Sequence, residues 1–171
     1  MARKSKKVGL LDIVKMLAAA VGLVLAVVGL CIPFFAQVTQ SIVGDNTVSL
    51  GLFEDYEALE AVMKDGGLTI GVVQAFAIVS LIFTVLASAL VILGKLNIIH
   101  MGTFVKLIFA IATIVFAALV ITFAATYAGQ SPLNLDGGEF GSTAFVAAAG
   151  AYLMTAGGVV SGVTLILSKL K

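Results

Sequence analysis

AFVAAAGAYLMTAGGVVSGVTLIL, residues 144–167, is an uncharged run of 24 residues that is rich in Gly and Ala. A helix needs about 20 apolar residues to cross the hydrocarbon core of a bilayer, so the run predicts a membrane-spanning helix. Gly158 and Gly162 are four residues apart, and so are Gly157 and Ser161. Small residues at this spacing let helix backbones approach closely. They predict a packing face, either within one bundle or between two copies of the chain.

The rest of the chain has the same character. Of its 171 residues 61% are hydrophobic and 11% are charged, and its mean hydropathy is +1.18. Soluble domains are about 45–50% apolar and about 25% charged. Backbone groups in hydrocarbon must be satisfied internally, which makes helices the default spans. We therefore predict an all-α integral membrane protein, a single tetraspan domain over residues 1–171 with spans near residues 10–35, 68–94, 103–128 and 142–167.

The charges predict the orientation of these spans. Nine of the ten Lys and Arg residues fall on one side of the predicted spans, with Asp12 as the only acid there. The segments on the other side contain Lys64 and eight acids. Basic loops stay in the cytoplasm. Both termini are expected to be cytoplasmic, with the protein in the plasma membrane and in contact with membrane lipid.

The residue inventory argues against several classes of function. Ionisable residues inside spans mark ion and proton pathways, and none is expected deep in these spans. His100 and Cys31 are the only His and Cys, so one chain lacks the ligands for a zinc site and the residues for a His-based triad. We predict no enzyme, no catalytic, metal or cofactor-binding residue, and no nucleic-acid partner. Gln74 is predicted to form a hydrogen bond between helices.

Residues 36–67 predict a small polar module outside the membrane. Gly44, Asp45 and Asn46 have turn chemistry. After them Val48, Leu50 and Leu52 alternate with smaller residues, which is typical of a half-buried strand. We expect a β-hairpin with a three-residue turn. The acidic stretch that follows has apolar residues at helical spacing and predicts a short amphipathic helix that contains Tyr56, Leu59 and Met63.

This layout resembles the claudin and peripheral-myelin-protein superfamily, with a large first and a small second outer loop and a hairpin after the first span. Gly51-Leu52-Phe53 looks like the family's Gly-Leu-Trp, and the segment 55–63 is similar to the one before the family's second span. The family's paired outer cysteines and its Trp are missing here. The resemblance implies a left-handed four-helix bundle capped by a small outer sheet, and it does not extend to a paracellular barrier.

Three functions fit these observations. The first is a tetraspan scaffold or adhesion-type protein that forms homo-oligomers through helix faces and the outer module. The second is an accessory subunit of a larger channel or transporter complex, and the third is a small pore. The residues expected to carry self-association are Gly157, Gly158, Ser161 and Gly162 in the membrane, and Val48, Leu50, Leu52, Phe53 and Tyr56 outside it.

Overall fold

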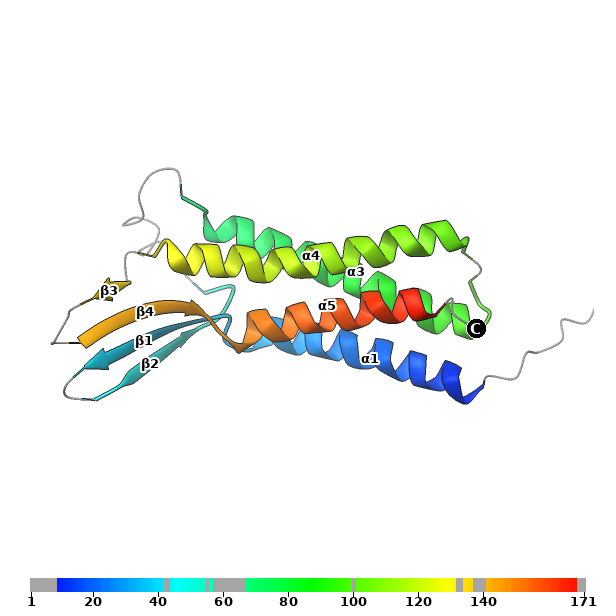
Figure 1. Ribbon diagram of the computed structural model, residues 1–171, viewed down its shortest axis with the longest axis horizontal. Helices are drawn as coiled ribbons and strands as arrows, with labels where there is room; N and C mark the ends of the chain where they lie inside the picture. The colour runs from blue at the N-terminus through cyan, green and yellow to red at the C-terminus, as the bar shows by residue number, and fades with distance from the viewer. Residues whose placement is uncertain are drawn as a thin grey trace, which may run out of the picture.

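The structure is a computed structural model that describes residues 9–41, 44–54, 56, 67–99, 101–131, 134–136 and 141–168. Four long helices lie side by side, and a small sheet extends from one end of the bundle (Figure 1). Each helix is long and apolar enough to cross a bilayer. This confirms the prediction of a mainly helical chain with four candidate spans. The helices are α1 (Leu10–Cys31), α3 (Ile70–Lys95), α4 (Thr103–Gly129) and α5 (Ala149–Leu167).

Large apolar side chains lie on the outside of the bundle and small ones lie inside it. Val24 of α1, Ile82 of α3 and Ile111 of α4 are 59%, 51% and 51% exposed. Hydrocarbon solvates such side chains as well as a protein core does, so close contact between small residues becomes the main source of helix association. The fully buried positions accordingly include Ala19, Ala26, Ala77, Ala87, Ala110, Ala117, Ala124, Ser80, Thr84, Thr113 and Ser161.

The sheet has four antiparallel strands in the order β2-β1-β4-β3. The predicted hairpin is present as β1 (Phe35–Ser41) and β2 (Asn46–Leu50), with Phe35 opposite Leu50. On its other side β1 pairs along its whole length with β4 (Gly141–Ala147), and the two-residue β3 (Leu135–Asp136) pairs with β4. The sheet therefore joins segments that lie about a hundred residues apart in the sequence.

The start of the fourth span differs from the prediction. Residues 141–147 form β4, and α5 begins only at Ala149. A short apolar run suits a helix and a strand equally well by its hydropathy. Here pairing with β1 decides the outcome, and Thr143, Phe145 and Val146 have the β-branched or aromatic side chains that strands favour. The remaining 19 residues of α5 are about 28 Å long, which is close to the thickness of a hydrocarbon core.

The end of the first span also differs from the prediction, because α1 ends at Cys31 rather than near residue 35. Pro33 lacks an N–H and disfavours helical geometry in the residue before it. Ile32 is accordingly extended, with φ −98° and ψ 168°, and the chain enters β1 at Phe35. The chain thus passes from the apolar helix α1 to a strand within four residues, at the proline.

The turn of the hairpin is longer than the predicted three residues, because Asn46 already pairs with Thr39. Gly44 does adopt a positive φ of 142°, in the region that favours glycine. The Ser41 hydroxyl donates a hydrogen bond to the Gly44 carbonyl at 2.9 Å. The predicted amphipathic helix falls on residues outside the described ranges, except for Tyr56.

Candidate functional site: the sheet end of the bundle

The small residues of α5 pack against α1 at backbone distance. A β-carbon added to Gly150 would lie 2.6 Å from the Gly29 carbonyl oxygen, and one added to Gly157 would lie 2.5 Å from the Ala26 nitrogen. Both distances are too short for a real side chain. The glycines of α1 and α5 therefore form a seam along which the two backbones touch.

The neighbouring small residues of α5 face the other two helices. A β-carbon at Gly158 would lie 2.6 Å from the Ala117 side chain of α4, and one at Gly162 would lie 2.6 Å from Ile114. Ser161 is fully buried, and its hydroxyl lies 3.1 Å from the Ser88 hydroxyl of α3. The Ser88 hydroxyl also donates to the Ala19 carbonyl of α1 at 3.0 Å, so this contact joins three helices.

These positions correct one expectation about self-association. Gly157, Gly158, Ser161 and Gly162 are all buried between the helices of a single chain. Of the two alternatives for this small-residue face, the structure has packing within one bundle. A second copy of the folded chain therefore cannot reach these residues from outside the bundle.

An aromatic cluster anchors the sheet to the bundle. The Phe35 ring stacks on Phe145 of β4 at a centroid distance of 5.4 Å and meets Tyr127 of α4 at 5.4 Å and Tyr56 at 5.9 Å. All four side chains are buried, and so is Leu52. Aromatic pairs at such distances stabilise a structure beyond the area that they bury. The sheet is thus held firmly at the end of its strands that meets the helices.

Hydrogen bonds complete this junction. The Tyr56 hydroxyl donates to the Gly51 carbonyl at 2.7 Å, and the Gln74 side-chain amide of α3 donates to the Leu52 carbonyl at 3.0 Å. Gln74 was predicted to link two helices, but it links a helix to the outer module because it lies one turn inside α3, next to the junction. Burial, and then the nearby Glu54 carboxylate, raise the pKa of the Tyr56 phenol.

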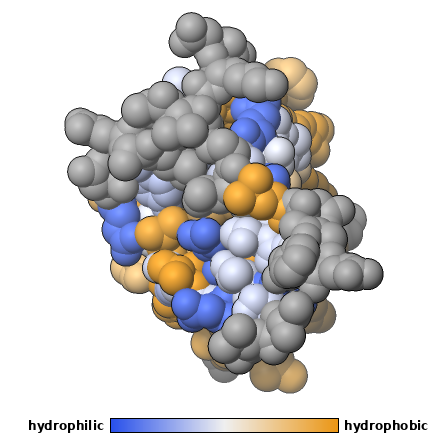
Figure 2. Space-filling view, turned by 90° about the vertical axis from the view of Figure 1, so that its left-hand side faces the viewer, coloured by the Kyte–Doolittle hydropathy of each residue, from blue (hydrophilic) through white to orange (hydrophobic). Residues whose placement is uncertain are grey.

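Beyond the junction the sheet is almost free of charge. The described strand residues include one acid, Asp136 at the end of β3, and no Lys or Arg. Figure 2 looks onto this end and shows polar and apolar side chains interleaved over the described surface. One face of the sheet carries Gln40, Asp136 and otherwise small or β-branched side chains, namely Ala36, Val38, Thr47, Ser49, Ser142, Ala144 and Val146.

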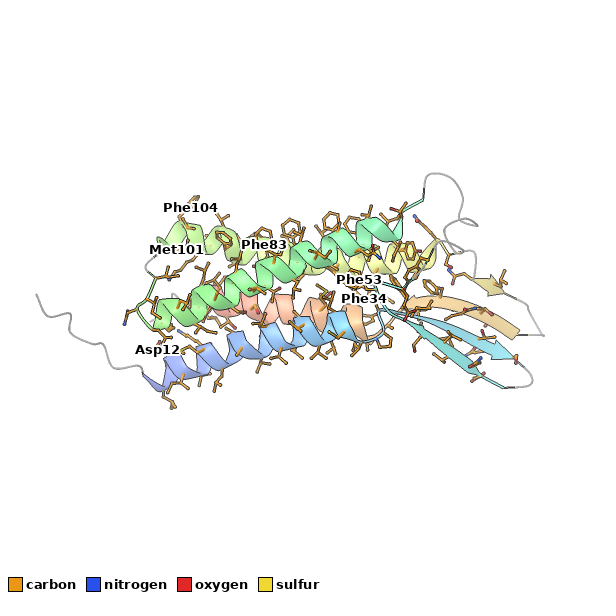
Figure 3. All side chains as sticks on the ribbon, turned by 180° about the vertical axis from the view of Figure 1, so that it is seen from behind. Asp12, Phe34, Phe53, Phe83, Met101 and Phe104 are labelled. Carbon is orange, nitrogen blue, oxygen red and sulfur yellow. The ribbon has the colours of Figure 1, made fainter. Side chains whose placement is uncertain are left out.

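The predicted outer contact residues divide into two groups. Leu52 and Tyr56 are 1% and 4% exposed and belong to the junction. Val48 and Phe53 are 48% and 58% exposed, and Leu50 is half-buried at the base of β2. Figure 3 shows Phe53 at the boundary between bundle and sheet, near Phe34. Of these five residues, Val48 and Phe53 are therefore the two that are strongly exposed.

Among the residues that the structure describes, no three His, Cys, Asp or Glu side chains come together as a metal site would require. Comparison with known proteins found no matching protein-family model, no matching curated protein and no matching solved structure. The resemblance of the layout and of Gly51-Leu52-Phe53 to the claudin superfamily stays a prediction from the sequence.

Proposed function

We propose that this chain is an adhesion-type membrane scaffold that joins copies of itself through the free edge of β2. The observation that carries the proposal is an uncharged edge strand, β2, that pairs with β1 alone among the described residues, in a sheet whose one described charge, Asp136, lies on the opposite edge. Anchorage in the plasma membrane, cytoplasmic termini and a relationship to the claudin superfamily are parts of the same proposal.

The free edge of β2 has the properties of a pairing template. An edge strand presents a row of backbone N–H and C=O groups, and proteins usually protect such an edge with Lys, Pro or a bulge. The strand Asn46–Leu50 reads NTVSL and contains no charge and no Pro. Its residues pair with β1 in continuous register from Asn46 to Leu50, so no bulge interrupts it.

A second copy of the same strand is a suitable occupant of this edge. If two β2 strands pair antiparallel about a two-fold axis at Val48, Val48 meets its own counterpart. Asn46 then lies opposite Leu50, and Thr47 lies opposite Ser49. Hydroxyl pairs and β-branched pairs across strands are both favourable, and no like charges meet. The interface would be isologous, as in most homodimers.

The direction of the strands indicates which copies could pair. Figure 1 shows β1, β2 and β4 extending away from the bundle in roughly the direction of the helices. Antiparallel pairing of two such strands turns the second bundle around, so that the two bundles point in opposite directions. This arrangement suits copies in two facing membranes, and it supports an adhesion role in preference to side-by-side assembly.

A thiol cross-link tests the proposal. We would combine Val48→Cys with Cys31→Ser, place the variant in two vesicle populations with different affinity tags, and mix them under mild oxidation. We expect a disulfide-linked dimer that carries both tags, since directly opposite residues are about 5 Å apart in such a pair. Val146→Cys, an exposed position on the central strand β4, is the matched control.

Two results would contradict the proposal. One is a cross-link no more abundant than that of the Val146 control. The other is extraction of the native protein only together with a larger partner chain, which would favour the accessory-subunit function.

A further inference from the structure

The bundle has a cavity at the end opposite the sheet. It has a volume of about 80 Å³ and lies among the last turns of α3 and α5 and the first turns of α4. Figure 3 shows Asp12 at this same end. The walls contain two ammonium groups, two apolar side chains and one hydroxyl, from Leu90, Val91, Gly94, Lys95, Lys106 and Ser168.

The two lysines of the cavity differ in their partners. Lys95 donates a hydrogen bond to the Asp12 carboxylate at 2.6 Å, so its charge is balanced. Lys106 forms no ion pair with any residue that the structure describes. Within the described part of the chain, the cavity therefore holds one lysine, Lys106, whose charge no acidic side chain balances.

The Lys106 ammonium lies close to Gly94. A β-carbon at residue 94 would be 3.4 Å from the Lys106 nitrogen, so that the ammonium rests over the glycine on the surface of α3. A larger side chain at this position would occupy the cavity and displace the ammonium. The Ser168 hydroxyl donates to the Leu165 carbonyl at 2.7 Å and is already engaged. The unbalanced Lys106 is thus the principal group that could recognise a ligand.

The length of α3 places this cavity in the headgroup layer of a membrane. Its 26 residues span about 39 Å, whereas a hydrocarbon core is about 30 Å thick. Gly94 and Lys95 at the end of the helix then lie beyond the core, while Leu90 and Val91 lie one turn deeper. Lipid phosphates are the anions found at this level, and basic pockets between membrane helices bind them.

We propose that the cavity binds the phosphate group of an anionic phospholipid. Lys106 provides the charge, Gly94 leaves the space, and Leu90 and Val91 contact the apolar part of the same lipid. The proposal is independent of the sheet-edge function, because it concerns the other end of the molecule.

Lipid retention tests this site in the full chain. The protein would be extracted from lipid discs that contain equal amounts of phosphatidylglycerol and phosphatidylcholine, and retained lipid would be counted by native mass spectrometry. We expect wild type to retain phosphatidylglycerol in preference. Lys106→Gln and Gly94→Leu should each reduce that preference roughly fivefold, and Lys106→Arg should preserve it.

Two variants control for charge and for helix substitution. Lys4→Gln removes the same charge from the basic N-terminal stretch, and Gly71→Leu adds the same side chain at the open, opposite end of α3. Both should retain phosphatidylglycerol as wild type does. Inorganic phosphate would be added as a competitor. If it removed the preference for phosphatidylglycerol completely, the cavity would be a site for free phosphate, and the lipid proposal would be wrong.

The proposal would be overturned if Lys106→Gln retained phosphatidylglycerol as well as wild type. It would also be overturned if Lys4→Gln lost the lipid to the same extent, because membrane attraction by any basic residue would then explain the binding. The comparison of Lys106→Gln with Lys106→Arg remains decisive even if Gly94→Leu does not fold.

Discussion

Gly22 of α1 and Gly157 of α5 lie face to face, and a β-carbon on either one would collide with the backbone of the other. Gly22 is also next to Ser161, whose hydroxyl reaches Ser88 on α3. This contact is thus the point at which three helices meet. The glycines of α5 let the helices of one chain pack closely, so substitutions there should change the stability of that chain. Association between copies is measured separately, with substitutions in the sheet.

Gly157→Leu should destabilise the monomer itself. The new side chain would meet the Ala26 backbone at a position with no room to shift, so we expect a loss of roughly 3 kcal/mol, at the upper end of the range for overpacked cores. Thermal unfolding in detergent measures the effect. Gly71→Leu, where the space is open, should unfold as wild type does. Equal stability of both variants would contradict the seam between α1 and α5.

Val48→Lys should weaken association between copies without unfolding the chain. Val48 is exposed, so a lysine there costs the monomer little, but in the proposed dimer two lysines would lie directly opposite each other. We expect about tenfold weaker association, measured as aggregation of protein-bearing vesicles at low salt. Ser142→Lys adds the same charge to the exposed central strand and should aggregate normally. Normal aggregation of the Val48 variant would remove the β2 edge from the mechanism.

Gln74→Ala should loosen the outer module and leave the helices intact. The substitution removes the side-chain hydrogen bond to the Leu52 carbonyl, and such a bond contributes about 1 kcal/mol net. Hydrogen exchange of the backbone amides near Leu52 should become roughly fivefold faster. Thr126→Ala, which removes a bond within α4 on its exposed side, should leave these amides unchanged. An unchanged exchange rate in Gln74→Ala would show that the aromatic cluster alone holds the module.

The junction should open at alkaline pH. Because burial raises the pKa of Tyr56 in the folded state, the folded chain binds the phenol proton more tightly than the unfolded chain does. Stability from this group is therefore complete below pH about 10, the ordinary value for tyrosine, and declines as the pH rises above it. An ultraviolet titration of phenolate should show a late-ionising tyrosine that is lost in Tyr56→Phe. Ionisation of all tyrosines in one step would contradict the burial.

The number of helices and their approximate extents could be predicted from the sequence because they depend on local properties. The middle of a long uncharged run favours a helix because its backbone groups must be satisfied within the segment, and Lys and Arg mark the cytoplasmic ends of such runs. The hairpin was likewise readable, since Gly44 has turn chemistry and Val48, Leu50 and Leu52 alternate with smaller residues. These signals act over a few residues and do not require knowledge of the fold.

Local signals in the sequence were thus enough for the four helices and the hairpin, whereas β4 and the packing partners of every element depended on the fold. Residues 141–147 became a strand because β1 was available beside them, although their hydropathy continued that of the following helix. Gly157 and Gly158 are adjacent in sequence, yet one contacts α1 and the other α4. Pairing and packing depend on which surfaces meet in space. A pattern of small residues in the sequence is the same whether these residues pack against their own chain or against another.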